Sequence, residues 1–381
     1  MIKLLEKELA FFAKYIYSRF RPFVIGITGS SGKTTTKYFI GELLKKTEKS
    51  VYVASGNLNT ETGLPLSVLM FSKSPSNILD FLWIAIYAPI KAIFTVKYPK
   101  YLVLEYAADK PNDMDYLTQI IAPDVAVITN IGVAHIEAFG SVEKIAEEKW
   151  KLATATKQKI ITTHDVFERC QNLTKPNAEI LLVPDKETIY SNNIKFLTNK
   201  TEFDLFVQGE KFTTSFQFLG VHNIWNLELA LLALLNVTGN KKMIDYIDDL
   251  TPLDGRGNRF VGRRDILVID ESYNANPLSM MAALEVMDKI KYGRKVAILG
   301  EMKEIGKISD KSHIEISKAA RKIAKLTIGV GEGFKEANLD YWYANVGELE
   351  KEIDNILKPN DIVLVKGSRS NHLEKIVEKL K

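Results

Sequence analysis

The sequence predicts an α/β protein of two domains, each built around a mostly parallel sheet. Short β-branched runs such as "YLVLEYA" (101–107) and "PDVAVITNIG" (123–132) alternate with stretches of helical spacing. This alternation is typical of a parallel sheet covered on both faces. A segment with one Pro and two Gly, "TPLDGRGNR", starts at residue 251, and the alternation then resumes. With 381 residues, both parts can bury a core.

Each element follows from its own pattern. The first 22 residues mix charge into every turn and predict an amphipathic helix that Pro22 ends. After it we expect a strand, a loop and a helix over 34–46, a strand at "SVYVAS", an apolar insertion over about 74–100, and hairpins at the sheet edge within 159–218. "NIWNLELALLALLNVTG" predicts an apolar helix packed inside this domain.

Beyond residue 251 the expected strands are "DILVID", "KVAILG", "LTIGVG" and "DIVLVKG". Helices are expected between them over about 278–291 and 312–325, and a final helix follows. The expected domains are therefore 1–22, 23–250 and 251–381.

Bulk properties exclude several classes of protein. The chain has 51 basic and 47 acidic residues, a net charge of +4, and it has no dense basic block, so we expect no nucleic-acid partner. A single cysteine, Cys170, excludes a disulfide framework and suits a reducing compartment. The N-terminus lacks the apolar core of a signal peptide. In the most apolar segment only ten uncharged residues separate Asp80 from Lys91, fewer than the roughly 18 that a spanning helix needs. We expect a cytoplasmic monomer.

The stretch "VIGITGSSGKTTTKYFIGELL" (24–44) has the layout of a strand, a phosphate loop and a helix. Glycines at 29 and 32 permit the tight turn that lets backbone N–H groups meet phosphate oxygens at a helix N-terminus. Lys33 would reach the terminal phosphates, and the Thr34 hydroxyl would bind Mg²⁺. The common P-loop spacing fails, because Ile27 stands where its first glycine belongs. The alternative is an ordinary Gly-rich turn. The nucleotide-binding residues would be Gly29, Ser30, Ser31, Gly32, Lys33, Thr34 and Thr35.

Two further groups follow strands of the same predicted sheet. Glu105 ends "YLVLE", and His135 comes soon after "VAVITNIG". Ligands gather at the carboxyl ends of parallel strands, so a carboxylate and an imidazole beside a phosphate loop could bind a second cation. Taken singly, each could equally be structural. Lys149, in "AEEKWKL", would by itself be a solvated lysine on a helix.

Nine motifs occur in one order along the chain, and together they resemble the Mur ligase family. They are "TGSSGKTT", "NLNTETGLPLSVL", "LEYAADKPNDMDYL", "TNIGVAHIEAFGSVEKIAEEKWKL", "GVHNIWNLELAL", "GRGNR", "IDESYNANPLSM", "ILGEMKEIG" and "VLVKGSRS". The family writes its phosphate loop as T-G-x-x-G-K-[ST], which accounts for the unusual spacing. The resemblance implies a central P-loop-type ATPase domain and a smaller Rossmann-like C-terminal domain.

The resemblance also implies a reaction. Members of the family are ATP-dependent acid–amino-acid ligases of cell-wall precursor synthesis, and "ESYNANP" is similar to the branch that adds D-alanyl-D-alanine. The partners would be an amino acid or dipeptide and an acceptor with a peptide carboxylate, joined through an acyl phosphate. Two alternatives remain: a ligase of the same family with another acceptor, such as a lipid-linked muropeptide or other amino-acid polymer, and a non-catalytic ATP-binding module.

The site residues that the resemblance implies come from both domains. Besides the loop, it implies ATP with two Mg²⁺ sites, the metal ligands being Thr34, Glu105, His135 and a Lys149 carbamylated by CO₂. A carbamate turns a cation into an anion that can bind Mg²⁺. Asn223 and Asn226 match the adenine block, Arg256 the arginine near the phosphates, and Asp270 the aspartate on the ribose. The residues expected to position the amino-acid substrate are Tyr273, Asn274, Asn276, Lys366, Ser368 and Arg369, although "KGSRS" could also be a plain surface loop.

The N-terminal part departs from the family. The phosphate loop begins after one helix, so we expect the domain that grips the UDP-sugar of the substrate to be missing. The first 22 residues and the insertion carry aromatic and basic side chains, and three interpretations are open. They could pack together as a helical pair over the sheet, form an interfacial surface that faces a membrane or a lipid-linked precursor, or leave the substrate grip to a separate partner protein.

Overall fold

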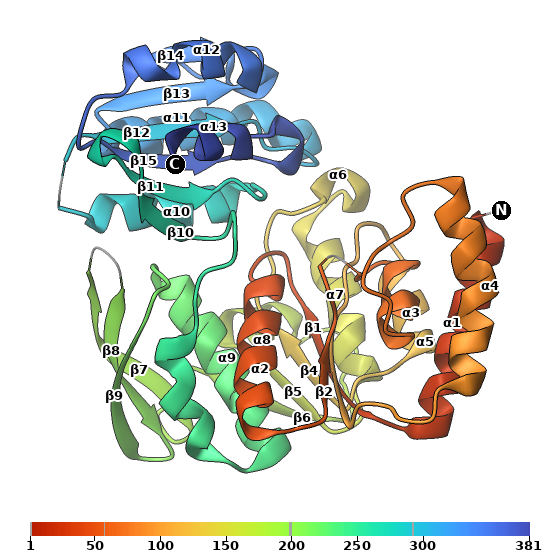
Figure 1. Cartoon of the computed structure of the whole chain (residues 1–381). Helices are drawn as coiled ribbons and strands as arrows, with labels where there is room; N and C mark the ends of the chain where they lie inside the picture. Colours follow the sequence, from red (N-terminus) through yellow and green to blue (C-terminus); the bar gives the residue numbers. More distant parts are fainter. Residues whose placement is uncertain (1, 57, 198–199, 292) are drawn as a thin grey trace.

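The computed structural model describes residues 2–56, 58–197, 200–291 and 293–381 and shows two α/β domains stacked over one another (Figure 1). Asn57, in the second of the nine motifs, lies outside these ranges. The first domain holds a sheet of six parallel strands in the order β2-β3-β1-β4-β5-β6. Its strands are β1 (Phe23–Thr28), β2 (Val51–Val53), β3 (Tyr101–Glu105), β4 (Val125–Ile128), β5 (Lys159–Thr163) and β6 (Glu179–Val183).

Alternate residues of these strands enter two different hydrophobic cores. On β1, Val24 belongs to the core beneath α1 (Ile2–Phe20), α5 (Asp113–Ile120) and α7 (Val142–Ala155). Ile25 and Ile27 belong to the core beneath α2 (Lys33–Thr47) and α9 (Val221–Thr238). Both faces are therefore buried, which is why the strands are almost purely apolar. The helices are α2 (Lys33–Thr47), α5 (Asp113–Ile120), α6 (Ile136–Phe139), α7 (Val142–Ala155), α8 (His164–Cys170), α9 (Val221–Thr238) and the 3-10 helix η1 (Lys241–Asp249).

The prediction of edge hairpins over 159–218 is wrong for its first half. β5 and β6 are parallel strands of the main sheet. The helix α8 joins them, and a helical crossover imposes parallel pairing. The second half does form hairpins, in a separate antiparallel sheet that packs against α9. Its strands are β7 (Ile189–Phe196), β8 (Thr201–Val207) and β9 (Glu210–Phe216).

The second domain has a sheet in the order β10-β11-β15-β12-β13-β14, parallel except for β10. The expected strands are β11 (Leu267–Glu271), β12 (Lys295–Gly300), β13 (Leu326–Val330) and β15 (Ile362–Lys366), with helices α10 (Pro277–Lys289), α11 (Ser309–Ile323) and α13 (Glu374–Leu380). Three elements were not predicted: β10 (Asn258–Val261), β14 (Tyr341–Tyr343) and α12 (Val346–Ile356). Short 3-10 helices stand at Arg263–Asp265 (η2), Gly306–Ile308 (η3), Glu332–Phe334 (η4) and Arg369–Asn371 (η5). We place the domain boundary near residue 251, as proposed from the sequence.

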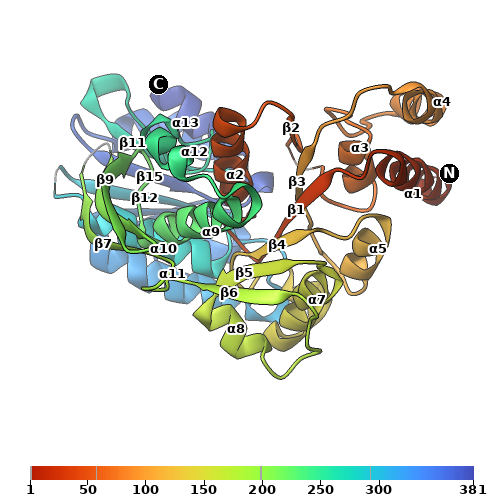
Figure 2. The same ribbon diagram turned by 90° about the horizontal axis from the view of Figure 1, so that it is seen from below.

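The N-terminal helix and the apolar insertion form a helical pair, α1 (Ile2–Phe20) and α4 (Ile78–Phe94), beside the short α3 (Gly63–Val68). Leu9 and Ile16 of α1 and Ile84 of α4 share one core with the main sheet. Both views place the pair at the end of the first domain that is remote from β7–β9 (Figures 1 and 2). No helix in the described ranges is long and apolar enough to cross a membrane.

Candidate active site

The phosphate loop has the geometry that its glycines predict. Gly29 and Gly32 have φ of 148° and 78°, a region that favours glycine, and α2 begins directly after Gly32. A Cβ on Gly29 would lie 1.9 Å from the Thr129 hydroxyl, and one on Gly32 would lie 2.6 Å from Oδ1 of Asn226. The Lys33 ammonium donates to the Gly29 carbonyl at 2.7 Å and so folds back over the loop. Desolvation there lowers the pKa of Lys33 below its usual range.

The end of β4 holds this loop in place. The Ser31 backbone N–H donates to Oδ1 of Asn130 at 2.8 Å, and the Asn130 amide donates back to the Ser31 hydroxyl at 2.6 Å. The Ser30 hydroxyl bonds both backbone groups of Gly132 at 2.9 Å. Because these partners are about 100 residues away in sequence, the loop conformation is fixed by the folded sheet before any ligand binds.

Glu105 is a buried carboxylate with three partners beside the loop. Its Oε2 accepts from the Thr34 hydroxyl at 3.1 Å and pairs with the Lys37 ammonium at 3.2 Å, while its Oε1 accepts from the Asn59 amide at 2.9 Å. Burial opposes its ionisation, but the positive charges of Lys37 and Lys33 outweigh burial and hold the pKa of Glu105 below its usual range. Glu105 is thus an anion at neutral pH, next to the hydroxyl expected to bind Mg²⁺.

Lys149 is not the solvated lysine that its charged neighbours in sequence suggest. It lies on the inner face of α7 with 1% of its surface exposed. Burial, and then the positive charge of Lys33, lower the pKa of Lys149 to about 7. The lowered pKa makes the neutral amine, the form that can react with CO₂, accessible near neutral pH.

His135 stands between the two domains. Its Nδ1 lies 2.7 Å from Oε2 of Glu304, in the loop after β12, and its Nε2 lies 3.4 Å from Oδ1 of Asp109. The hydrogen bond from His135 lowers the pKa of Glu304. Both His135 and Glu304 have positive φ, 55° and 64°. The backbone N–H of Glu137 also faces the Glu304 carbonyl, at 3.5 Å.

The second domain contributes a stack of cationic and aromatic side chains. The Arg256 guanidinium lies 4.0 Å from the centre of the Tyr273 ring, and that of Arg369 lies 5.5 Å from it. The Lys366 ammonium, 3% exposed, donates to the Asn274 carbonyl at 3.0 Å and pairs with Glu271 at 3.3 Å. These contacts hold three cations around one turn at the C-terminal ends of β11 and β15.

Several predicted residues have structural partners. Asp270 accepts from the Gly255 backbone N–H at 3.0 Å and from the Ser272 hydroxyl at 2.6 Å, so its carboxylate holds the turn that carries Arg256. Asn276 caps α10 in a capping box with Ser279. The Ser368 hydroxyl accepts from the Lys303 backbone N–H at 2.9 Å. The ribose and substrate roles of these residues remain predictions.

A cavity of about 1140 Å³ joins the two domains and brings most of the predicted site together. Asn223 and Asn226 reach it from the start of α9, where the Asn223 amide donates to the Leu219 carbonyl at 2.8 Å. The predicted residues that line it are Ser30, Ser31, Gly32, Lys33, Thr34, Thr35, Glu105, His135, Asn223, Asn226, Arg256, Tyr273, Asn274, Asn276 and Lys366. Those that do not line it are Gly29, Lys149, Asp270, Ser368 and Arg369.

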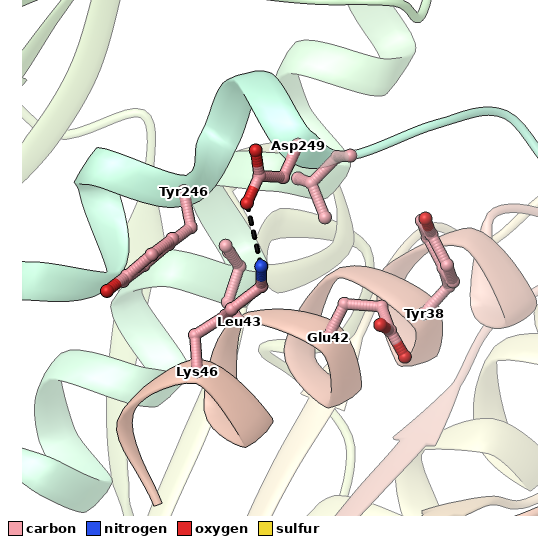
Figure 3. A pocket seen from close by; sticks show the side chains of 7 residues that line it. Tyr38, Glu42, Leu43, Lys46, Tyr246 and Asp249 are labelled. Atoms are coloured by element: carbon pink, nitrogen blue, oxygen red, sulfur yellow. Dashed lines mark hydrogen bonds and ion pairs between the residues drawn. The ribbon is translucent and has the colours of Figure 1, made fainter.

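A second, smaller pocket of about 370 Å³ lies between α2 and η1 (Figure 3). Lys46 and Asp249 pair across it at 2.8 Å, and both side chains are about half exposed. None of its lining residues belongs to the phosphate loop. It is a surface hollow between two helices and carries no part of the site.

The donor set beside the loop suits a hard cation. Mg²⁺ takes oxygen ligands, and the Thr34 hydroxyl and the ionised Glu105 are both present. Within the described ranges, no three His, Cys, Asp or Glu side chains cluster closely enough to hold a metal by themselves. A magnesium ion here would therefore depend on phosphate oxygens and on a carbamate, if Lys149 carries one.

The sequence did not lead us to predict the side chains that hydrogen-bond or pair with the predicted site residues. Lys37 follows Lys33 by one helical turn, a spacing that places both on one face of α2 and could have indicated it. Asn59 and Asn130 follow strands β2 and β4, where ligands gather. Glu304 had no such signal, because its partner His135 lies in the other domain.

Comparison with known proteins fits this geometry. The family model for the Mur ligase middle domain matches residues 27–234, more than half of the chain, and that for the Mur ligase glutamate ligase domain matches 255–369. The chain belongs to the Mur ligase family. A UDP-N-acetylmuramoyl-tripeptide–D-alanyl-D-alanine ligase of Borreliella burgdorferi is 30% identical to this Mur ligase in an alignment of 371 positions, which covers 93% of this chain and 73% of that protein. The protein of the same name in Bacillus subtilis is 29% identical and covers 94% and 75%.

Solved structures agree with the family. MurF ligase from Thermotoga maritima, in complex with ADP, superposes with a TM-score of 0.83 at 26% identity and covers 98% of this Mur ligase and 83% of that chain. Folylpolyglutamate synthase from Mycobacterium tuberculosis superposes with a TM-score of 0.68 at 14% identity and covers 97% and 95%, which shows a shared fold alone. The predicted fold class, two α/β domains of the Mur ligase type, is confirmed.

Proposed function

We propose that this chain is a MurF-type ligase that uses ATP to join D-alanyl-D-alanine to the peptide carboxylate of a UDP-N-acetylmuramoyl-tripeptide. One observation carries the proposal: cations from two domains line one cavity whose floor is a preformed phosphate loop. The relatives named for this activity and the ADP complex of the Thermotoga maritima enzyme support it.

The reaction would have two steps. A carboxylate oxygen of the acceptor attacks the γ-phosphorus of ATP, the bond to the β-phosphate oxygen breaks, and ADP leaves an acyl phosphate behind. The amine of the incoming dipeptide then attacks the acyl carbon, loses a proton and expels inorganic phosphate as the amide forms. The first step brings two anions together, so charge neutralisation and positioning must supply the rate enhancement.

Particular side chains would supply that charge. Lys33 would leave the Gly29 carbonyl for the β- and γ-phosphates, and Arg256 would approach the same phosphates from the second domain. Thr34 would hold the magnesium of ATP, and Glu105, His135 and a carbamylated Lys149 would hold a second Mg²⁺. Bound there, Mg²⁺ neutralises charge on the transferring phosphoryl group. Asn223 and Asn226 would contact adenine.

The test is phosphate release from MgATP with each substrate omitted in turn. The proposal predicts release only when UDP-N-acetylmuramoyl-tripeptide and D-alanyl-D-alanine are both present. Release with another acceptor instead would assign the chain to the same chemistry with a different substrate. ATP hydrolysis that is indifferent to every acceptor would contradict the proposal and favour a nucleotide-binding module.

A further inference from the structure

The α1/α4 pair carries most of the exposed large hydrophobic side chains in the described part of the molecule. Of twenty large hydrophobic side chains exposed there, thirteen belong to α1, to α4 or to Val96 just after it. On α4 the most exposed are Leu79, Ile86 and Phe94, at 71%, 68% and 74%. Their spacing of seven and eight residues places them on one stripe of the helix. Single exposed hydrophobic residues need no explanation, but a continuous stripe does.

The opposite face of α4 packs against α1. Ile84, Ala88 and Ala92 are buried against α1, and α1 is the main helix on which α4 packs. A helix on the surface of a globular domain turns a polar face outward, whereas a helix that is apolar all round normally lies inside a core or at a membrane. α4 is apolar on both faces and lies at the edge of the molecule in both views (Figures 1 and 2). On its outer face, Trp83 and Tyr87 touch Phe71 edge-on, whereas the stripe of Leu79, Ile86 and Phe94 stays largely exposed among the described residues.

The charge of the two segments that form this pair favours an anionic partner. Residues 1–22 and 70–100 contain nine basic and three acidic side chains, a net charge of +6, so the rest of the chain carries −2. Two of the three acids are engaged: Asp80 accepts from Ser76 at the start of α4, and Glu6 accepts from Thr62. Lysines and arginines at 3, 7, 14, 19, 21, 73, 97 and 100 are exposed. A second copy of the chain docked through this face would bring like charges together, whereas an anionic surface would attract them.

Two aromatic side chains on the same face suit a lipid interface. Trp83 and Tyr87 are stacked with ring centres 4.8 Å apart, and both are about half exposed. Such amphipathic rings favour the headgroup level of a bilayer. α4 is about 25 Å long, contains Pro89 and does not qualify as a spanning helix, so it would lie in the plane of the interface.

We propose that the α1/α4 pair docks this protein on the surface of an anionic lipid bilayer, with α4 in the interface and the basic residues on the headgroups. The inference goes beyond the proposed ligase reaction and does not depend on it, because none of the stripe residues lines the cavity.

The test is flotation of the full chain with phosphatidylcholine vesicles that contain or lack phosphatidylglycerol. The chain should float with the anionic vesicles, at least about tenfold more than with the neutral ones, and raised salt should release it. The triple variant Leu79→Ser, Ile86→Ser, Phe94→Ser should lose at least about tenfold of that binding. The matched control Val261→Ser, Tyr341→Ser removes two exposed hydrophobic side chains from the second domain and should bind like the unaltered chain.

A second pair of variants separates charge from apolar contact. Lys14→Gln with Lys97→Gln should weaken anionic binding by about 25-fold, since each lysine contributes roughly fivefold. Lys318→Gln with Lys325→Gln, in the second domain, should leave it unchanged. No flotation with anionic vesicles at low salt, or equal flotation of the triple serine variant, would overturn the proposal. If the unaltered chain forms a dimer that the triple serine variant dissociates, the proposal is also overturned, because the apolar face would then bind a second copy of the chain.

Discussion

The two sides of the cavity are built in different ways. On the side of the first domain, hydrogen bonds join the phosphate loop to Asn130 and Gly132, and the Asn59 amide donates to Glu105. On the side of the second domain, Arg256 stacks on Tyr273 and Lys366 donates to the Asn274 carbonyl, so both are held within that domain. Their position relative to the phosphate loop depends on contacts between the domains, such as the one between His135 and Glu304. One side is preorganised, and the other depends on the domain position.

This contrast suggests a division of work. Phosphate binding would need only the first domain, because the loop conformation is already fixed by hydrogen bonds within it. The chemistry would need both domains, because Arg256 reaches the cavity from the second. Closing domains commonly complete a catalytic site in this way. The predictions below test the two sides, from the largest expected effect to the smallest.

Lys33→Ala should abolish turnover, with a fall in kcat of at least about 10³-fold, because the lysine is the cation nearest to the expected phosphates. Nucleotide binding, measured by calorimetry, should weaken as well. Lys45→Ala, at an exposed position on the same helix, is the matched control and should keep full activity. Turnover by Lys33→Ala comparable to that of the unaltered chain would remove the phosphate loop from the mechanism.

Lys149→Ala should lower activity by about 10²-fold or more, and a small carboxylate such as acetate should partly restore it without bicarbonate. Lys144→Ala, an exposed lysine on the same helix, is the control. Full activity of Lys149→Ala would exclude the carbamate.

The pH dependence of the same residue has a defined sign. Its pKa is lowered to about 7, so the neutral amine is scarce below pH 7 and predominates above it. Bicarbonate activation should therefore increase as the pH rises through about 7, and activity assays with and without bicarbonate would measure it. An activation that decreases over this interval would contradict the assignment.

Glu304→Ala should reduce kcat/KM by only about three- to tenfold, because a partly exposed hydrogen-bonded pair contributes about 1 kcal/mol. The loss of kcat/KM should come from the chemical steps, which need both domains. The affinity for ATP alone should therefore stay within about twofold of that of the unaltered chain. Glu315→Ala, another exposed acid of the second domain, should change neither. If Glu304→Ala lowers the affinity for ATP as much as it lowers turnover, ATP binding also depends on the domain contact, and the proposed difference between the two sides of the cavity is wrong.

Glu228 tests the interior of the first domain without touching the cavity. It is buried on α9, and burial, against hydrogen bonds from Ser191, raises the pKa of Glu228 to about 7. A raised pKa in the folded state stabilises the fold below the unfolded value and loses that contribution as the pH rises through about 7. Glu228→Gln should flatten this dependence, by up to about 3 kcal/mol in the free energy of unfolding between pH 4.5 and 7.5. Denaturant unfolding at several pH values measures this free energy. If the unaltered chain and Glu228→Gln show the same pH dependence of the free energy of unfolding, the prediction is contradicted.

The sequence predicted the first side of the cavity well, because its residues are local. Gly29, Gly32 and Lys33 lie in one turn whose conformation follows from its glycines, and Glu105 ends a strand next to it. The alternation of strands and helices also predicted both domains. These features depend on contacts within one βα unit or between neighbouring strands.

The second side could not be predicted in the same way. The contact between His135 and Glu304 joins residues 169 positions apart and depends on how the domains dock. The burial of Lys149 also depends on packing, since its neighbours in sequence are charged. The pairing of β5 with β6 was missed because short alternating runs do not reveal which strand lies beside which.

The most direct test of the central claim follows oxygen atoms. The acceptor's reacting carboxyl group would be labelled with ¹⁸O, and the phosphate released during ligation would be analysed by mass spectrometry. Because a carboxylate oxygen bridges to phosphorus in the acyl phosphate and leaves with it, the account predicts one labelled oxygen in each phosphate released. Amide product formed alongside unlabelled phosphate would contradict it.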